Sequence, residues 1–326
     1  MVSFRRPSRL HVLLSFAFCL PALTAALGQP PYQVRFRVTG ESIIVVPVTI
    51  NGSGPFDFML DTGDTKTLID QKLAEELHLP NVGARRVTAP GKEAVTALAH
   101  TDSVSMGGAD VRGLNLFVIN HLADGQSHVR GSLGEDFMRH FDILIDNRHH
   151  LIQFEPSPGP LTDMVAGERL PLSLNGSIEK ERTENRLIIV GHCFESGDRE
   201  IKFQLDSGVS GIVLFSGLNP MTVSLLPPHF VGGPLGGGFE ANFQTAHLQL
   251  GKRVFNKAVA VPEGNLSLRG VDVDGLLPTS LFQSIFISHS GKFVILEPSA
   301  KPAIAQSKPS SLTETEIPEV ECMPTE

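Results

Sequence analysis

Two stretches of the chain share one pattern: Phe56-Asp57-Phe58-Met59-Leu60-Asp61-Thr62-Gly63 and Ile201-Lys202-Phe203-Gln204-Leu205-Asp206-Ser207-Gly208. In each stretch, large apolar residues occupy every second position before the Asp, which is typical of a β-strand with one buried face. Each stretch then ends in Asp-[Thr/Ser]-Gly, and Asp61 and Asp206 lie 145 residues apart (206 − 61). Two copies of one half-site in a single chain could bring their carboxyl groups together across an internal two-fold axis.

Further landmarks recur in the same order in both parts of the chain. A glycine turn, at Gly91 and at Gly236, follows each Asp by 30 residues. Each part then closes with a glycine- and leucine-rich segment, 131–137 or 275–281, and with a strand that ends in Glu155-Pro156 or Glu297-Pro298. Landmarks that repeat at a nearly constant offset indicate an internal duplication.

The composition favours a mostly β chain, since Gly (31) and Pro (23) are frequent and short Val/Ile/Leu runs lie between them. We expect an N-terminal lobe over 31–157, a linker over 158–166 and a C-terminal lobe over 167–298. The segment 170–174 could mirror 34–38 as an opening strand. Asp70 should begin a short helix that Pro80 ends. The tail over 299–326 is polar and without periodicity, so we expect it to be disordered.

The first 28 residues have the pattern of an export signal. Arg5, Arg6 and Arg9 precede an apolar stretch over 10–20, and Ala26-Leu27-Gly28 fits a cleavage site. The alternative is an uncleaved anchor, but the apolar stretch is short for a membrane span. We therefore expect a protein exported to a periplasm or out of the cell, with no membrane association after the signal is removed.

The charge and the cysteines exclude several classes of function. The net charge of −8 argues against binding to nucleic acid or to an anionic membrane surface. Cys193 and Cys322 alone do not make a disulfide framework, so Cys193 is interpreted as a core residue. No histidine spacing matches a common zinc site, and no phosphate-binding loop is present, so neither a metal nor a cofactor is expected.

A lone Asp-[Ser/Thr]-Gly is a common turn, but here its flanking strands and its downstream Gly-x-Leu-Gly segment both recur. On these residues the sequence resembles the retropepsin-like aspartic peptidases, the family that includes retroviral proteases and is related to pepsin. The matching segments are 60–63 with 131–134, and 205–208 with 275–277. The phrase Gly54-Pro55-Phe56-x-Phe58 is most similar to exported bacterial members. The resemblance implies an all-β fold of two acid-protease β-barrel lobes that pair around a cleft.

The resemblance also implies the roles of individual residues. Asp61 and Asp206 become a catalytic dyad for the hydrolysis of peptide bonds, in which one ionised carboxylate activates a water and the other, protonated, acts on the substrate carbonyl. The residues that support the dyad are Thr62, Gly63, Ser207 and Gly208. The hairpin tips that would close over an extended polypeptide substrate are Pro90, Gly91 and Gly236.

Three departures from the family pattern leave alternatives open. Asp64 follows the first tripeptide, where a small residue is usual; it faces either the dyad or solvent. If it faces the dyad, the pH optimum is less acid than in pepsin and Asp64→Ala lowers it. Pro278 stands where the second copy should have a glycine, which could reshape that lobe. The second copy is also less typical of the family than the first.

These departures keep two rival hypotheses beside a monomeric endopeptidase with an Asp61/Asp206 dyad. The fold could be a peptide-binding module that has lost activity. Alternatively, the N-terminal lobes of two chains could pair, so that the protease works only as a homodimer through Asp61.

Overall fold

The computed structural model describes residues 32–40, 42–89, 92–120, 128–175, 185–197, 199–215, 224–232, 238–262 and 272–300. The expected signal peptide over 1–28 lies outside these residues, as does 301–326 of the expected tail. The described residues are mostly β, with three short α-helices, so the predicted all-β fold is confirmed. None of these helices has the length and the apolar composition that crossing a bilayer requires.

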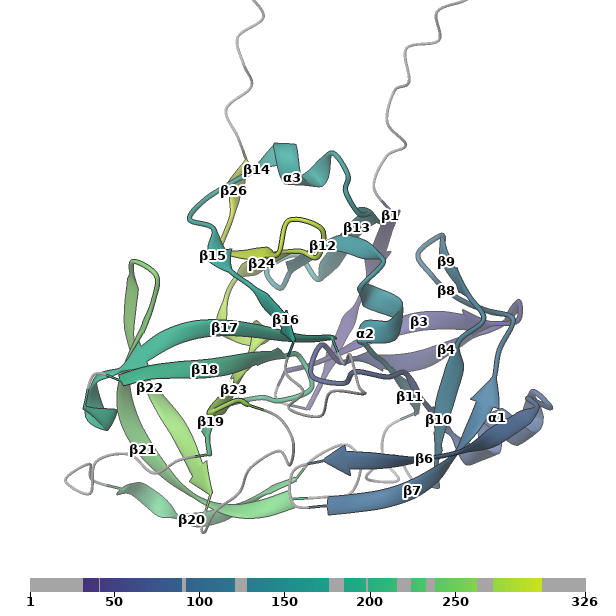
Figure 1. The fold of residues 1–326 in the computed structure, drawn as a ribbon, viewed down its shortest axis with the longest axis horizontal. Helices are drawn as coiled ribbons and strands as arrows, with labels where there is room; N and C mark the ends of the chain where they lie inside the picture. The colour runs from purple at the N-terminus through teal and green to yellow at the C-terminus, as the bar shows by residue number, and fades with distance from the viewer. Residues whose placement is uncertain are drawn as a thin grey trace, which may run out of the picture. The chain divides into compact units, whose positions relative to one another are not determined.

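Both halves of the chain contribute to one six-stranded sheet (Figure 1). Its order is β1 (Tyr32–Arg35), β13 (Leu151–Pro156), β12 (Phe141–Asp146), β24 (Ser284–Ser288), β25 (Phe293–Leu296) and β15 (Leu170–Pro171). At its centre β12 and β24 are antiparallel, and Leu144 pairs with Phe286. Ile143 pairs with Ile287 and Ile145 with Ile285. This mirrored register is the one expected of two equivalent strands that meet at a two-fold axis.

The outer strands of this sheet are equivalent as well. Val34 of β1 pairs with Ile152, and Leu170 of β15 pairs with Val294. The prediction that 170–174 mirrors the opening strand is therefore confirmed at its start. The turns after β12 and β24 match too, since His150 (φ 53°) and the second turn's Lys292 (φ 52°) share a left-handed backbone.

The rest of the first half forms a large, highly bent sheet. Its strands, in chain order, are β2 (Arg37–Thr39), β3 (Ile43–Ile50), β4 (Ser53–Leu60), β5 (Leu68–Asp70), β6 (Asn81–Ala89), β7 (Lys92–His100), β8 (Ser103–Met106), β9 (Ala109–Arg112), β10 (Asn115–Ile119) and β11 (Val129–Leu133). In β4, Phe58 and Leu60 are buried as the alternation predicted, but Met59 on the other face is buried too. The end of β4 is therefore covered on both sides.

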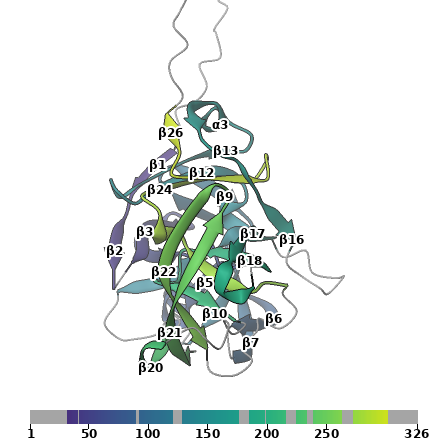
Figure 2. The same cartoon turned by 90° about the vertical axis from the view of Figure 1, so that its left-hand side faces the viewer.

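The second half repeats this arrangement with fewer described strands. They are β16 (Ser173–Asn175), β17 (Asn185–Cys193), β18 (Arg199–Asp206), β19 (Ile212–Leu214), β20 (Ser224–Gly232), β21 (Gly238–Leu250), β22 (Arg253–Pro262) and β23 (Gly275–Pro278). Figure 2 shows the long strands β21 and β22 side by side, in line with their antiparallel pairing. Cys193 at the end of β17 is buried, as expected of a core residue.

Short helices connect the strands: α1 (Gln71–Glu76), α2 (Glu135–Met138), α3 (Leu161–Met164), and the 3-10 turns η1 (Phe194–Ser196) and η2 (Thr279–Leu281). Helix α1 lies where the sequence predicted a helix, with Asp70 at its N-cap and Leu73 and Ala74 buried. The expected linker over 158–166 contains α3 and β14 (Val165–Ala166). The tail prediction was wrong at its start, because β26 (Ser299–Ala300) pairs with β14.

One apolar core runs through both halves. It includes Phe58 and Leu60 before the first Asp, and Phe203 and Leu205 before the second, all at most 1% exposed. Full burial of a side chain of this size contributes about 1.5–3 kcal/mol. The two Asp-x-Gly turns are therefore anchored to a shared interior.

Candidate active site

The two Asp-x-Gly turns start from equivalent strand ends. The neighbour of β4 is β11, which runs parallel to it with Leu60 opposite Leu133, and the neighbour of β18 is β23, with Leu205 opposite Leu277. In the first half, the backbone N–H of Asp61 donates to the carbonyl of Leu133 at 3.0 Å. The glycine- and leucine-rich segments thus lie directly beside the strands that lead to the aspartates.

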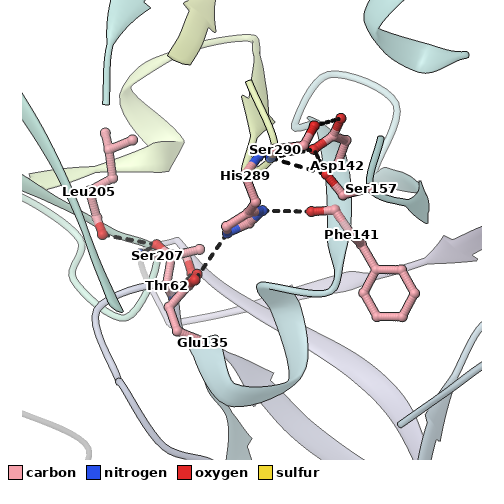
Figure 3. A network of polar contacts seen from close by, with 9 residues as sticks. All are labelled: Thr62, Glu135, Phe141, Asp142, Ser157, Leu205, Ser207, His289 and Ser290. Carbon is pink, nitrogen blue, oxygen red and sulfur yellow. Dashed lines mark hydrogen bonds and ion pairs between the residues drawn. The ribbon is translucent and has the colours of Figure 1, made fainter. Parts of the chain in front are cut away.

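Four buried hydrogen bonds tie the two turns to each other, and Figure 3 includes three of the residues that make them, Thr62, Leu205 and Ser207. The Thr62 hydroxyl donates to the Leu205 carbonyl at 3.1 Å, and the Ser207 hydroxyl donates to the Leu60 carbonyl at 2.7 Å. In return, the Thr62 N–H donates to the Ser207 hydroxyl and the Ser207 N–H to the Thr62 hydroxyl, each at 3.0 Å. Each side chain therefore bridges to the opposite half, as the resemblance implied.

The two glycines allow the turns to approach. A Cβ on Gly63 would lie 2.4 Å from the carboxyl of Asp206, and one on Gly208 would lie 2.3 Å from Oδ2 of Asp61. Each glycine N–H also donates to its own half's aspartate, Gly63 to Asp61 at 2.9 Å and Gly208 to Asp206 at 2.8 Å. Any side chain at these positions would displace the opposite carboxyl group.

Asp61 and Asp206 are both buried, and each carboxyl group lies against the glycine of the opposite turn, where the two carboxyls act on each other's pKa. The open question about Asp64 is answered as well. Its Oδ2 accepts from the hydroxyl of Ser132 at 2.9 Å, its N–H donates to the carbonyl of Asp61 at 3.2 Å, and its carboxyl acts on the pKa of Asp61. Asp64 faces the dyad rather than solvent, so three carboxyl groups share this site.

The three carboxyl groups influence one another's protonation. Burial raises the pKa of Asp61, although hydrogen bonds from Gly63 and from the carboxyls of Asp206 and Asp64 oppose this. Burial and then the charge of Asp61 raise the pKa of Asp206 and of Asp64 well above their usual range. Because the carboxyls act on one another in this way, the protons of the set titrate together.

Two polar residues beside the dyad were missed from the sequence. Arg186 of β17 is buried, and its guanidinium donates to Oε1 of Gln204 at 3.1 Å. The side-chain amide of Gln204 in turn donates to the carbonyl of Gly63 at 2.7 Å. The alternation in β18 placed Gln204 on the exposed face, whereas it is only 2% exposed. The sequence did contain one sign of this: Gln204 is a polar residue two positions before Asp206, where the first copy has Met59.

A second buried polar network connects the halves behind the dyad (Figure 3). The ring of His289 contacts the carbonyl of Phe141 through Nδ1 at 2.6 Å and the carboxyl of Glu135 through Nε2 at 3.0 Å. Asp142 accepts from the backbone N–H of His289 at 2.9 Å and from surrounding serine hydroxyls. Glu135 opens α2, and its own N–H donates to the carbonyl of Asp64 at 2.8 Å. This network therefore reaches the first Asp-x-Gly turn.

The predicted hairpin tips fall on residues outside the described part of the chain: Pro90, Gly91 and Gly236. The strands that flank them are described and form the expected hairpins. Ala89 of β6 pairs with Lys92 of β7, and the strands β20 and β21 pair up to Gly232 and Gly238. Both hairpins lie at the bottom of Figures 1 and 2, away from the six-stranded sheet.

Pro278 does not reshape the strand in which it stands. The register of β23 along β18 continues to the pair of Asp206 with Pro278, and η2 follows where α2 follows in the first half. The φ of Pro278, −67°, suits both the strand end and the start of a helical turn. The substitution therefore changes the helix type after the strand and leaves the Asp-bearing edge intact.

Residues 46–137 match the family model described as aspartyl protease. This segment of the chain is similar to aspartyl proteases. This match covers the first Asp-x-Gly turn and ends within α2, so the predicted retropepsin-like family is confirmed for this part of the chain. A comparison with curated proteins returned no match. Within the described residues, no group of three His, Cys, Asp or Glu side chains is arranged to hold a metal ion.

Proposed function

We propose that this protein is an aspartic endopeptidase that hydrolyses peptide bonds with a water activated between Asp61 and Asp206. The observation that carries the proposal is the placement of the two buried carboxyl groups, each against the glycine of the opposite turn, at the point where Thr62 and Ser207 hold the turns together. The aspartyl protease domain around the first turn supports the same reaction class.

The proposed reaction uses the two aspartates unequally. With Asp61 as the ionised carboxylate of the pair, Asp61 accepts a proton from the water, whose oxygen attacks the carbonyl carbon of the peptide bond. Asp206, which holds a proton, gives it to the carbonyl oxygen, so that a tetrahedral diol forms. As the diol collapses, one hydroxyl proton returns to Asp206 and the leaving nitrogen takes the proton from Asp61. The products are an acid and an amine, and the dyad regains its starting state.

The proposed substrate is an extended polypeptide that lies between the dyad and the two hairpins, β6–β7 and β20–β21. An extended segment suits a site flanked by hairpins because its backbone groups can pair with those of neighbouring strands. The tips around Pro90, Gly91 and Gly236 would close over it. We propose a monomer, since one chain supplies both aspartates.

The test is the cleavage of an unfolded, fluorescently labelled polypeptide by Asp61→Asn and Asp206→Asn. Each change removes one of the two proton-transfer groups, so each should lower kcat/KM by at least about 100-fold. Asp110→Asn is the matched control, because Asp110 lies in the first half on β9 and is exposed. The control should cleave at the wild-type rate.

The rival hypotheses predict different results in the same assay. A homodimer that works through Asp61 alone would keep full activity in Asp206→Asn, and this result would refute the internal dyad. A binding module would cleave nothing in the wild-type form, yet would still bind the unfolded polypeptide. Failure of the wild-type protein to cleave, and to bind an inhibitor of aspartic active sites, rejects the peptidase.

A further inference from the structure

The two halves place different residues at equivalent positions around the dyad. In the first half Ser132 pairs with Met59, and in the second half Leu276 pairs with Gln204. Asp64, three residues after Asp61, corresponds in the same way to Val209, three residues after Asp206. The hydrogen-bonded pair of Asp64 and Ser132 is therefore replaced by two apolar side chains in the second half.

The reverse holds for the pair of Arg186 and Gln204. Val45 lies opposite Met59 in the first half, and Ile188 lies opposite Gln204 in the second. Ile43 lies two residues before Val45, and Arg186 lies two residues before Ile188. Each of them therefore lies on the same face of its strand as the later residue. The guanidinium and amide of the second half are therefore replaced by Ile43 and Met59 in the first. One side of the dyad therefore carries an extra carboxyl group, and the other side carries an extra positive charge.

The guanidinium of Arg186 is connected to the turn on the opposite side of the dyad. Arg186 donates to Gln204, and Gln204 donates to the carbonyl of Gly63, which belongs to the turn that carries Asp61 and precedes Asp64. An arginine stays protonated at every pH of interest, so this connection holds a fixed positive charge beside the carboxyl cluster.

The charged groups that act on the cluster come from both halves. Asp64 lies on the Asp61 turn, Arg186 on β17, and the dyad carboxyls act on each other. The guanidinium of Arg186 opposes the rise in pKa that burial causes at Asp64 and Asp206. Its positive charge therefore favours the ionised form of these two carboxyls.

We propose that Arg186 is a positioning residue that sets the upper pH limit at which the dyad still holds its working proton. This inference rests on the proposed peptidase function. Arg186 lowers the limit because its charge favours the ionised carboxyls. Because Arg186 and Gln204 have apolar counterparts in the other half, this charge acts on the dyad from one side only.

The test compares the pH profile of kcat/KM in the full-length wild type, Arg186→Met and Arg186→Lys. The alkaline limb should move up by about one pH unit in Arg186→Met and stay near the wild type in Arg186→Lys, which keeps the charge. Arg199→Met, which removes an exposed arginine at the far end of β18, should leave the profile unchanged. A uniform loss of rate without a displaced limb, or a limb that moves down in Arg186→Met, overturns the proposal.

A second measurement does not depend on cleavage. In protein labelled with ¹³C at the aspartate carboxyls, NMR titration should show the dyad signals titrating at higher pH in Arg186→Met. Arg186→Lys, which keeps the charge, should titrate near the wild type. If the wild type cleaves nothing but the titration moves up in Arg186→Met, the peptidase function fails and the charge inference stands. Unmoved titrations overturn the inference whatever the activity.

Discussion

Replacing His289 by phenylalanine should remove a stabilising contribution that depends on pH. Both ring nitrogens of His289 face acceptors, the Phe141 carbonyl at 2.6 Å and the Glu135 carboxyl at 3.0 Å. A ring that donates from both nitrogens is the charged imidazolium form. The backbone N–H that donates to Asp142 is kept in the variant, so the change isolates the ring.

The direction of the pH effect follows from the balance of forces on the ring. Burial lowers the pKa of His289, but the charge of Glu135, the hydrogen bonds to Glu135 and Phe141, and the charge of Asp142 outweigh it, so the pKa is raised. His140 also lies near enough for the two histidines to repel each other when charged. The stabilisation is therefore complete below the unfolded-state pKa of about 6.5 and is lost as the pH rises through the folded-state pKa.

The magnitude follows from the burial of the pair. The side chains of His289 and Glu135 are 4% and 1% exposed, so the variant leaves a buried carboxylate without its counter-charge. Breaking a buried pair in this way costs about 3–5 kcal/mol. This is a large part of the total free energy of unfolding of an ordinary domain, about 5–15 kcal/mol. The full difference in the free energy of unfolding between the wild type and His289→Phe is expected at the acid end of the tested pH range.

The assay is urea denaturation followed by far-ultraviolet circular dichroism, since the chain has no tryptophan to serve as a fluorescent probe. Wild type and His289→Phe are compared from about pH 5 to about pH 8. The difference in the free energy of unfolding should shrink as the pH rises. His149→Phe is the control: its ring contacts Asp146 at 2.7 Å but is 66% exposed, so it should change stability by less than about 1 kcal/mol. A difference that stays constant or grows with pH refutes the reasoning.

Two further predictions concern the Asp-x-Gly turns. Gly208→Ala should lower kcat/KM by about 100-fold, because its Cβ would lie 2.3 Å from Asp61 and displace the carboxyl, whereas Gly211→Ala, with open space around it, should be neutral in the same assay. Ser207→Ala should lower the free energy of unfolding by about 2–4 kcal/mol in urea denaturation, since the Thr62 N–H and the Leu60 carbonyl both lose a buried partner. A Ser207→Ala protein as stable as the wild type would contradict this assignment.

The parts of the fold that could be predicted are those that leave a local and repeated mark on the sequence. An alternating strand that ends in Asp-x-Gly is visible in any window of eight residues, and its second copy fixed the offset for the other landmarks. The helix after Asp70 and the hairpins around 90–91 and 233–237 follow from turn and capping residues.

The parts that could not be predicted depend on contacts between distant residues. The partners His289 and Glu135 are 154 residues apart and belong to different halves, so no spacing pattern connects them. Gln204 was placed on an exposed face because period-two alternation assumes one covered side, whereas the end of β18 is covered on both sides. The inward direction of Asp64 likewise depends on Ser132, a residue of another strand.

The unequal surroundings of the two aspartates have a consequence for how such a protein can evolve. In a two-fold assembly of identical chains, every substitution occurs twice, so an arginine introduced beside one aspartate is introduced beside both. Covalent linkage of the halves removes this constraint, because Arg186 and Ile43 are encoded separately. A single chain can thus tune its acid and its base one at a time, a freedom that a symmetric pair of subunits does not have.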